Sequence, residues 1–225
     1  MAHRDTPSAR AEGDVSRGTD LTPPPEAREI FGAQLELTVR YVEQLADAGI
    51  HRGLIGPREV PRLWERHVLN CAVLTDLAPR QTSVIDVGSG AGLPGVVMAI
   101  RRPDLRVTLV EPLLRRATFL SEVIEDLGLR KVRVVRDRAE KQHGQLLADV
   151  VTARAVAHMD KLARWCLPLT RRGGVLLAMK GERAEQELEE STDVLRQRAG
   201  DPGEVVECGT QWLEPPTRVI RVHRG

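Results

Sequence analysis

The chain has 225 residues, of which 41% are hydrophobic and 29% charged, and its formal net charge is +1. This length allows one sizeable hydrophobic core with room for a short extra subdomain, and the composition is that of a soluble globular protein. Because the net charge is close to zero, a surface that binds nucleic acid would have to be a local cluster of basic residues.

The sequence disfavours membrane, secreted and metal-binding classes of protein. It contains no apolar run of the roughly 18 residues that a membrane span needs, and no secretory signal at its start. Its three cysteines, Cys71, Cys166 and Cys208, are far apart and lack C-x-x-C spacing. We therefore expect small core thiols, no bound metal, no disulfide framework and a cytoplasmic location.

Residues 1–25 are predicted to be a disordered tail. Apart from the initiator Met, their large apolar residues are Val15 and Leu21. Burial of so little apolar surface cannot offset the entropy lost when a chain becomes ordered.

Residues 26–80 are predicted to form a helical cap that precedes the main domain. Apolar residues recur every three or four positions from Ile30 to Ala48 and again from Trp64 to Leu74, which predicts helices over 26–49 and 61–77. Arg66 and His67 lie on the second helix. His67 is either a substrate contact or a partly buried, hydrogen-bonded histidine.

Residues 81–225 alternate between strand-like and helix-like patterns, which predicts a mostly parallel α/β sheet covered by helices on both faces. The turn residues 214–216 join the last two strands and indicate an antiparallel edge strand. The expected strands are 83–87, 107–110, 132–135, 149–152, 175–179, 205–209 and 218–222.

The first strand leads into the stretch Ile85-Asp-Val-Gly-Ser-Gly-Ala-Gly-Leu-Pro-Gly95. Strand, glycine turn and helix together are typical of a nucleotide-binding loop, because glycine lets the backbone approach a ligand. Asp86 would repel a pyrophosphate, but could face a cationic group such as the ammonium of S-adenosylmethionine. Glu111, at the end of the next strand, is placed to take two ribose hydroxyls. The loop with Gly88 and Gly90 therefore favours S-adenosylmethionine over a dinucleotide. The dinucleotide pattern Gly-x-Gly-x-x-Gly is nevertheless formally present in the same stretch.

Ligands of open α/β sheets bind outside the carboxyl ends of the strands. This rule gathers Asp86, Glu111, Glu140, Arg154 and Lys180 at one edge. The segment at Glu140 can cradle an adenine by main-chain atoms and a side-chain acid. Arg154 and Lys180 would hold the cofactor carboxylate or a target phosphate, unless they form structural ion pairs.

Several motifs in order make the chain similar to the RsmG (GidB) family of bacterial ribosomal RNA small subunit methyltransferases over residues 30–222. They are Arg66-His-Val-Leu, IDVGSGAGLPG, Glu111-x-x-x-Arg115-Arg116-x-x-Phe119-Leu120, Asp137-Arg-Ala-Glu140, Arg154-Ala-Val and Met179-Lys-Gly181. The Gly-Leu-Pro-Gly extension and the Arg154-Ala step are more specific than the glycines alone.

The resemblance implies a Rossmann-like class I S-adenosylmethionine-dependent methyltransferase that methylates N7 of the guanine at position 527 of 16S rRNA. It also implies cofactor contacts at Gly88, Leu93, Ala139, Glu140 and Arg154. Many relatives carry Asn-Leu-Thr where this chain has Arg52-Gly-Leu-Ile-Gly56, and often Leu-Asp-Ser where Leu69-Asn-Cys71 stands. These departures concern substrate contacts from the N-terminal helices.

The expected chemistry requires no general base, because N7 of guanine has a lone pair and no proton to lose. We therefore expect no catalytic side chain, and a rate that rests on alignment. RNA phosphates would be contacted by basic residues, with Arg66, His67, Arg115, Arg116 and Lys180 as candidates, since aromatic residues make up only 3% of the chain.

The predicted partner is 16S rRNA or the small ribosomal subunit, bound by a monomer. Two alternatives remain at this point. One is a methyltransferase of another RNA, a protein or a small molecule, and the other is a non-catalytic Rossmann module that binds a ligand such as NAD.

Overall fold

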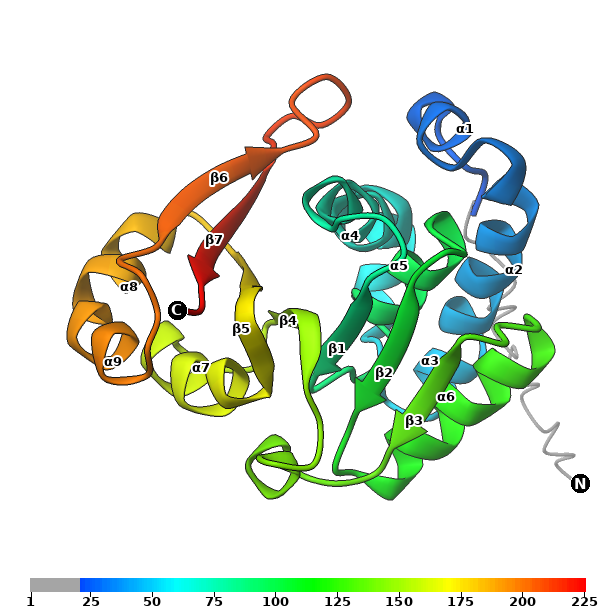
Figure 1. Ribbon diagram of the computed structural model, residues 1–225. Coiled ribbons are helices and arrows are strands. Elements are labelled where there is room, and N and C mark those ends of the chain that lie inside the picture. The colour runs from blue at the N-terminus through cyan, green and yellow to red at the C-terminus, as the bar shows by residue number, and fades with distance from the viewer. Residues whose placement is uncertain (1–20) are drawn as a thin grey trace, which may run out of the picture.

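The structure is a computed structural model that describes residues 21–225, and its centre is a seven-stranded sheet between two layers of helices (Figure 1). The strands are β1 (Ser83–Val87), β2 (Arg106–Val110), β3 (Val132–Val135), β4 (Ala148–Arg154), β5 (Thr170–Lys180), β6 (Glu204–Cys208) and β7 (Thr217–His223). The β-branched and apolar residues of β1, β2 and β4 explain why these central strands are extended and mostly buried.

The strand order is β3-β2-β1-β4-β5-β7-β6. The first five strands pair in parallel, whereas β7 is antiparallel to both β5 and β6. The predicted fold class, a mostly parallel seven-stranded sheet with an antiparallel strand near one edge, is confirmed. The reversed strand is β7, and β6 closes the edge beside it.

The helices cover the two faces of the sheet. They are α1 (Pro25–Phe31), α2 (Leu35–Ala46), α3 (Ala48–His51), α4 (Asn70–Val73), α5 (Gly95–Arg101), α6 (Leu114–Asp126), α7 (Met159–Cys166), α8 (Ala184–Glu190) and α9 (Thr192–Gln197). Helices α1 to α6 lie on one side of the sheet and α7 to α9 on the other (Figure 1). Within residues 21–225, none of the helices is long and apolar enough to cross a membrane.

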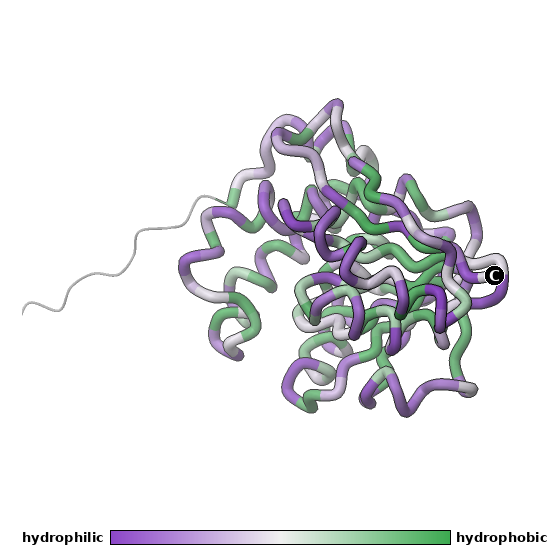
Figure 2. The backbone as a smooth tube through the Cα atoms, turned by 90° about the vertical axis from the view of Figure 1, so that its left-hand side faces the viewer, coloured by the Kyte–Doolittle hydropathy of each residue, from purple (hydrophilic) through white to green (hydrophobic). Residues whose placement is uncertain are grey.

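Each face of the sheet has its own core, because side chains alternate along a strand. Along β1, Val84 packs into the core under α1 to α6, whereas Ile85 and Val87 pack into the core under α7 to α9. The strands accordingly form a hydrophobic centre, and hydrophilic positions lie on the surrounding helices (Figure 2). The helical cap shares the first core with the sheet, so that cap and sheet are packed as one unit.

The two long helices expected in the cap are broken into shorter segments. The first is interrupted at Gly32, whose φ of 50° is incompatible with a continuing α-helix and is tolerated by glycine. In the second, a 3₁₀ segment (Pro57–Arg62) contains Pro61, which lacks a backbone N–H, and a π-helical segment (Leu63–Leu69) precedes α4. Residues 184–197 likewise form two short helices, α8 and α9, in place of one longer helix.

The boundary of the expected tail also differs from the structure. Residues 1–20 lie outside the described part of the chain, but the carbonyl of Leu21 accepts a hydrogen bond from Trp64 Nε1 at 2.7 Å. Pro25 begins α1, which suits a residue whose missing N–H would have no partner in a first helical turn. The end of the predicted 1–25 segment is therefore packed against the cap.

Candidate functional site

Two hollows meet outside the carboxyl ends of the central strands. The first, called here the cavity, has a volume of about 580 Å³, which lies within the range of small-molecule sites. The second, called the groove, has a volume of about 1350 Å³ and runs between residues 62–70 of the cap and residues 212–218. Both are lined by Arg154, the last residue of β4, and by Ala155 and Val156, which follow it.

The glycine loop, residues 88–95, forms one wall of the cavity, as its spacing predicted. Gly88 and Gly90 have φ values of 70° and 58°, in the region that favours glycine. A Cβ on Gly88 would lie 2.8 Å from Val156 Cγ2, so only a glycine lets the loop approach this residue closely. Leu93 lines the same cavity.

The amide groups of the loop are used within the protein. Gly88 and Ser89 donate to Val110, Gly92 and Leu93 donate to the Ser89 carbonyl, Gly90 donates to Glu111 and Gly95 donates to Asp86. A dinucleotide pyrophosphate is bound by free N–H groups of this kind of loop. In this loop the amides of Gly88, Ser89, Gly90, Gly92, Leu93 and Gly95 already have acceptors.

Glu111 lies in the wall of the cavity and is 1% exposed. Its Oε2 accepts from the Gly90 amide at 2.9 Å, and its Oε1 accepts from the Leu113 amide at 2.9 Å. Each carboxylate oxygen can accept a further hydrogen bond. Glu111 therefore fixes the loop and still offers acceptor capacity at the cavity.

Asp86 lies behind the loop and not in the wall of the cavity. It is 0% exposed, and its Oδ2 accepts from the Gly95 amide at 3.0 Å, at the start of α5. The same alternation that turns Ile85 away from α5 turns Asp86 toward it. The structure therefore differs from the predicted contact with a ligand cation, and Asp86 supports the loop from below.

The other oxygen of Asp86, Oδ1, is buried without a hydrogen-bond partner among the described residues. Burial raises the pKa of Asp86 to about 7, against the opposing effect of the Gly95 amide. A carboxyl group with this pKa is partly protonated near neutral pH.

The far side of the cavity is built from residues that follow β3 and from the cap. Ala139 is buried, Glu140 is exposed, and both line the cavity, whereas their predicted contact with a cofactor stays a prediction. The sequence did not point to Leu54 and Ile55, which belong to the cap and form an apolar part of the wall. Their place in a glycine-containing linker offered no periodic signal that would have identified them.

Arg154 ties the end of β4 to the π-helical segment of the cap. Its Nη1 donates to the His67 carbonyl at 3.5 Å and to Cys71 Sγ at 3.2 Å, and its Nη2 donates to the Arg66 carbonyl at 3.3 Å and to His67 Nδ1. Both Nη groups are thus directed into the protein. The predicted role, a grip on a cofactor carboxylate or phosphate, differs from this arrangement, because helix carbonyls compete for the same donors.

His67 is the partly buried, hydrogen-bonded histidine of the two possibilities raised by the sequence. Because arginine has no acceptor, Nδ1 must accept from Arg154, and Nε2 carries the proton that is donated to Glu59 Oε2 at 2.8 Å. Burial, followed by the charge of Arg154, lowers the pKa of His67. The imidazole also lines the cavity.

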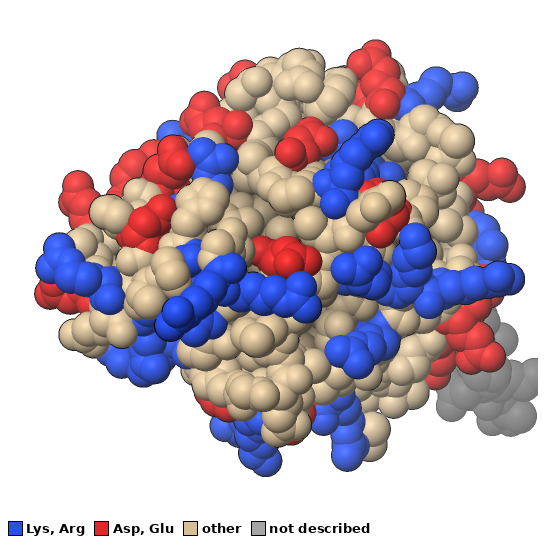
Figure 3. Space-filling view, viewed as in Figure 1, with Lys and Arg blue, Asp and Glu red and all other residues tan. Residues whose placement is uncertain are grey.

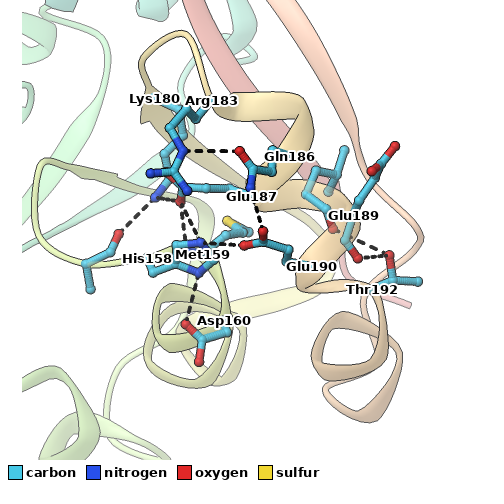
Figure 4. A network of polar contacts seen from close by, with 12 residues as sticks. His158, Met159, Asp160, Lys180, Arg183, Gln186, Glu187, Glu189, Glu190 and Thr192 are labelled. Atoms are coloured by element: carbon cyan, nitrogen blue, oxygen red, sulfur yellow. Dashed lines mark hydrogen bonds and ion pairs between the residues drawn. The ribbon is translucent and has the colours of Figure 1, made fainter.

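Lys180 lines the groove, but its charge is paired within the protein. Its side chain is 8% exposed, and Nζ donates to Glu187 Oε2 at 2.7 Å and to the Ala157 carbonyl at 2.8 Å (Figure 4). The same Glu187 oxygen accepts from the Met159 amide. Lys180 therefore holds the segment after β4 in place, which is the structural ion pair that the sequence left open.

The remaining basic candidates are not gathered at one place. Arg66 lines the groove and lies 3.3 Å from Glu59. Arg116 lines the cavity, with Nη1 3.9 Å from Glu111 Oε2 and with Nε buried and unpartnered within residues 21–225. Arg115 is exposed and lines neither hollow.

Ala155 has a φ of 54°, which is uncommon for a residue with a side chain. It lies directly between Arg154 and Val156, where the two hollows join. Backbone strain of this kind concentrates at functional sites. No group of three potential metal-binding side chains occurs in the part of the chain that the structure describes.

Comparison with solved structures identifies the class of fold. Precorrin-6y C5,15-methyltransferase from Geobacter metallireducens aligns with a TM-score of 0.52 and 15% identity, over 76% of this chain and 90% of that one. P. horikoshii TYW2, solved in complex with MeSAdo, aligns with a TM-score of 0.55 and 14% identity, over 71% and 63% of the two chains. The chain therefore has the Rossmann-like fold of class I methyltransferases.

Sequence relatives identify the family. The family model described as rRNA small subunit methyltransferase G matches residues 34–215. Two relatives are named ribosomal RNA small subunit methyltransferase G. The protein from Thermobifida fusca is 58% identical, and the match covers 90% of this chain and 85% of the relative. The protein from Streptomyces coelicolor is 53% identical, and the match covers 94% of this chain and 89% of the relative. The chain belongs to the rRNA small subunit methyltransferase G family.

The elevated pKa of Asp86 predicts a pH-dependent stability that Asp86→Asn removes. Because the folded pKa of about 7 lies above the ordinary value of 3.8, the folded state keeps a proton that the unfolded chain releases. The free energy of unfolding of the ligand-free wild type should therefore fall, relative to the variant, by up to about 3–4 kcal/mol between pH 4 and pH 7.

Urea unfolding of both proteins at several pH values measures this difference. Wild-type and variant curves that run parallel with pH would show that Asp86 ionises normally in the folded state.

Proposed function

We propose that the protein transfers a methyl group from S-adenosylmethionine to N7 of the guanine at position 527 of 16S rRNA. The observation that carries the proposal is the Glu111 carboxylate in the cavity wall, held by the loop amide of Gly90. An acid at this position suits a ligand with ribose hydroxyls. Family membership supports the same reaction.

The residues of the cavity fit this cofactor. Glu111 would accept from the ribose hydroxyls, the segment at Ala139 and Glu140 would hold the adenine, and Gly88, Gly90 and Leu93 would form the floor. The apolar wall includes Leu54 and Ile55 and would exclude water. Asp86 would act indirectly, through Gly95 and the start of α5.

A dinucleotide fits less well. Six amides of the glycine loop are bonded to Val110, Ser89, Asp86 and Glu111, so a pyrophosphate that used them would have to break these bonds. The same geometry argues against the non-catalytic NAD module.

The groove supplies the path for the target base. It joins the cavity at Arg154 to Val156, so a base that enters along the groove reaches the edge of the cavity there. Trp212 and Met179 offer apolar surface in the groove wall. A base must be unstacked to enter such a site, and an exposed loop of rRNA meets this need.

The reaction depends on the alignment of the attacking nitrogen with the methyl group, and it requires no proton transfer to a side chain. S-adenosylmethionine, when bound, supplies an electrophilic methyl group on its sulfonium sulfur. The protein has to hold the two hollows in register, and Arg154 does so by joining β4 to the cap. Alignment of this kind is worth about 7–11 kcal/mol when the geometry is good.

The surface offers local basic clusters for RNA despite the near-zero net charge. On the face shown in Figure 3, Lys and Arg side chains form a band across the middle, with acidic side chains between and around them. Arg66, in the groove, and exposed Arg115 are candidates for phosphate contacts. The monomeric state and the choice between free 16S rRNA and the small subunit stay predictions.

Nucleoside mass spectrometry of 16S rRNA tests the proposed reaction. N7-methylguanosine at position 527 should be lost from cells without the gene and return with the wild-type gene. Purified protein, S-adenosylmethionine and either free 16S rRNA or small subunits from the deletion strain would identify the substrate form. An unchanged modification in the deletion strain would reject this reaction.

Gly88→Ala should abolish measurable binding of S-adenosylmethionine. Its Cβ would lie 2.8 Å from Val156, beside the cavity, and its φ of 70° adds backbone strain. Gly173→Ala is the matched control, because Gly173 has a φ of 74° and a Cβ added there would meet no atom within 4 Å. Each substitution should cost about 1 kcal/mol in backbone strain, and calorimetry should show normal binding only for the control.

Glu111→Gln should weaken binding of S-adenosylmethionine at least about tenfold while the protein remains folded. A glutamine keeps the shape but has a single acceptor oxygen, so it cannot serve both Gly90 and Leu113 and the ligand hydroxyls. Glu122→Gln, an exposed residue paired with Arg52, is the control. Equal affinities for all three proteins in calorimetry would remove Glu111 from the site.

A further inference from the structure

Tyr41 is the single tyrosine of the chain and belongs to α2 in the helical cap. It is 0% exposed, and its hydroxyl donates to the Ala91 carbonyl of the glycine loop at 2.7 Å. Burial raises the pKa of Tyr41 well above its ordinary value, so the hydroxyl keeps its proton and remains a donor. This contact joins residues 50 positions apart in the sequence.

The loop is packed closely against this hydroxyl. A Cβ on Gly92 would lie 2.8 Å from Tyr41 Oη and 2.5 Å from Val96 Cγ2, so the bare backbone of Gly92 fits between the two. Gly92 has a φ of 100°, which favours glycine. A side chain at position 92 would therefore displace the Tyr41 hydroxyl, and a loop that moved away from α2 would leave the Ala91 carbonyl without this donor.

The contact between Tyr41 and Ala91 lies next to Gly90, which is bonded to Glu111 in the cavity wall. Gly90, next to Ala91, donates to Glu111 Oε2. On the other side of the loop, Gly95 is held by Asp86. Of these three attachments, the one from Tyr41 comes from the cap, whereas the other two come from the strands of the sheet.

We propose that Tyr41 is a positioning residue for the cavity, whose hydroxyl holds Ala91 and Gly92 in the conformation that directs the Gly90 amide to Glu111. The inference rests on the proposed function, since it assumes that the cavity binds S-adenosylmethionine. Because coupling between sites is reciprocal, a ligand in the cavity should also stabilise α2. The cap would then take part in cofactor binding through its interior and not only through its surface.

Tyr41→Phe removes the hydroxyl and keeps the ring in the core. We expect its affinity for S-adenosylmethionine, measured by titration calorimetry, to fall about five- to tenfold. The matched control is Thr38→Val, one turn earlier on α2. Thr38 is also 0% exposed, but its hydroxyl donates within the helix, to the Gln34 carbonyl at 2.9 Å. The control should bind the cofactor within twofold of the wild type.

Hydrogen exchange separates a positioning role from a general loss of stability. In ligand-free Tyr41→Phe, amides of residues 88–93 should exchange faster than in the wild type, whereas in Thr38→Val they should not. Wild-type affinity in Tyr41→Phe, or an equal loss of affinity in Thr38→Val, would overturn the inference while leaving the proposed function intact. A wild type that does not bind S-adenosylmethionine would overturn both.

The test remains decisive if Tyr41→Phe does not fold. In that event, exchange of α2 amides in the wild type is measured with and without S-adenosylmethionine. Slower exchange around Tyr41 in the presence of the ligand is the expected result. Protection confined to residues 88–93 and 111–113, with α2 unchanged, would show that the cap and the loop are not coupled.

Discussion

The hydrogen bond from the Gly90 amide to Glu111 joins the glycine loop to the end of β2 and so shapes the cavity wall. The parallel register pairs Val87 of β1 with Val110 of β2, so the residues that follow, Gly88 and Glu111, leave the sheet at the same level. The contact consumes a loop donor and places a buried carboxylate in the cavity wall. In the proposed reaction this carboxylate would take the ribose hydroxyls of the cofactor.

The helical cap is part of this site and not an attachment to it. Arg154 donates from the end of β4 to carbonyls of the π-helical segment, and these bonds keep the groove beside the cavity. Tyr41 reaches the glycine loop from α2. Since the cap and the sheet also share one hydrophobic core, a movement of the cap would disturb both hollows.

For two basic residues near the strand ends, the sequence predicted the position in the fold but not the protein groups that they contact. Arg154 and Lys180 were placed correctly at the carboxyl edge, and each lines a hollow. Their donors, however, are bonded to protein acceptors, His67 and Glu187 among them. A buried cation must be paired, and here carbonyl and carboxylate groups of the protein supply the partners. In this structure both residues therefore shape the hollows through protein contacts, and their contact with a ligand stays a prediction.

The sequence by itself determined the order and type of the strands, the glycine loop and the place of Glu111, because alternation and glycine spacing are local properties of the chain. It did not determine that Asp86 supports α5, that the cap helices break near Gly32 and Leu63, or that Leu54 lines the cavity. Those features depend on contacts between residues tens of positions apart. Only the docking of the cap on the sheet decides them, since no local pattern records which distant groups will become neighbours.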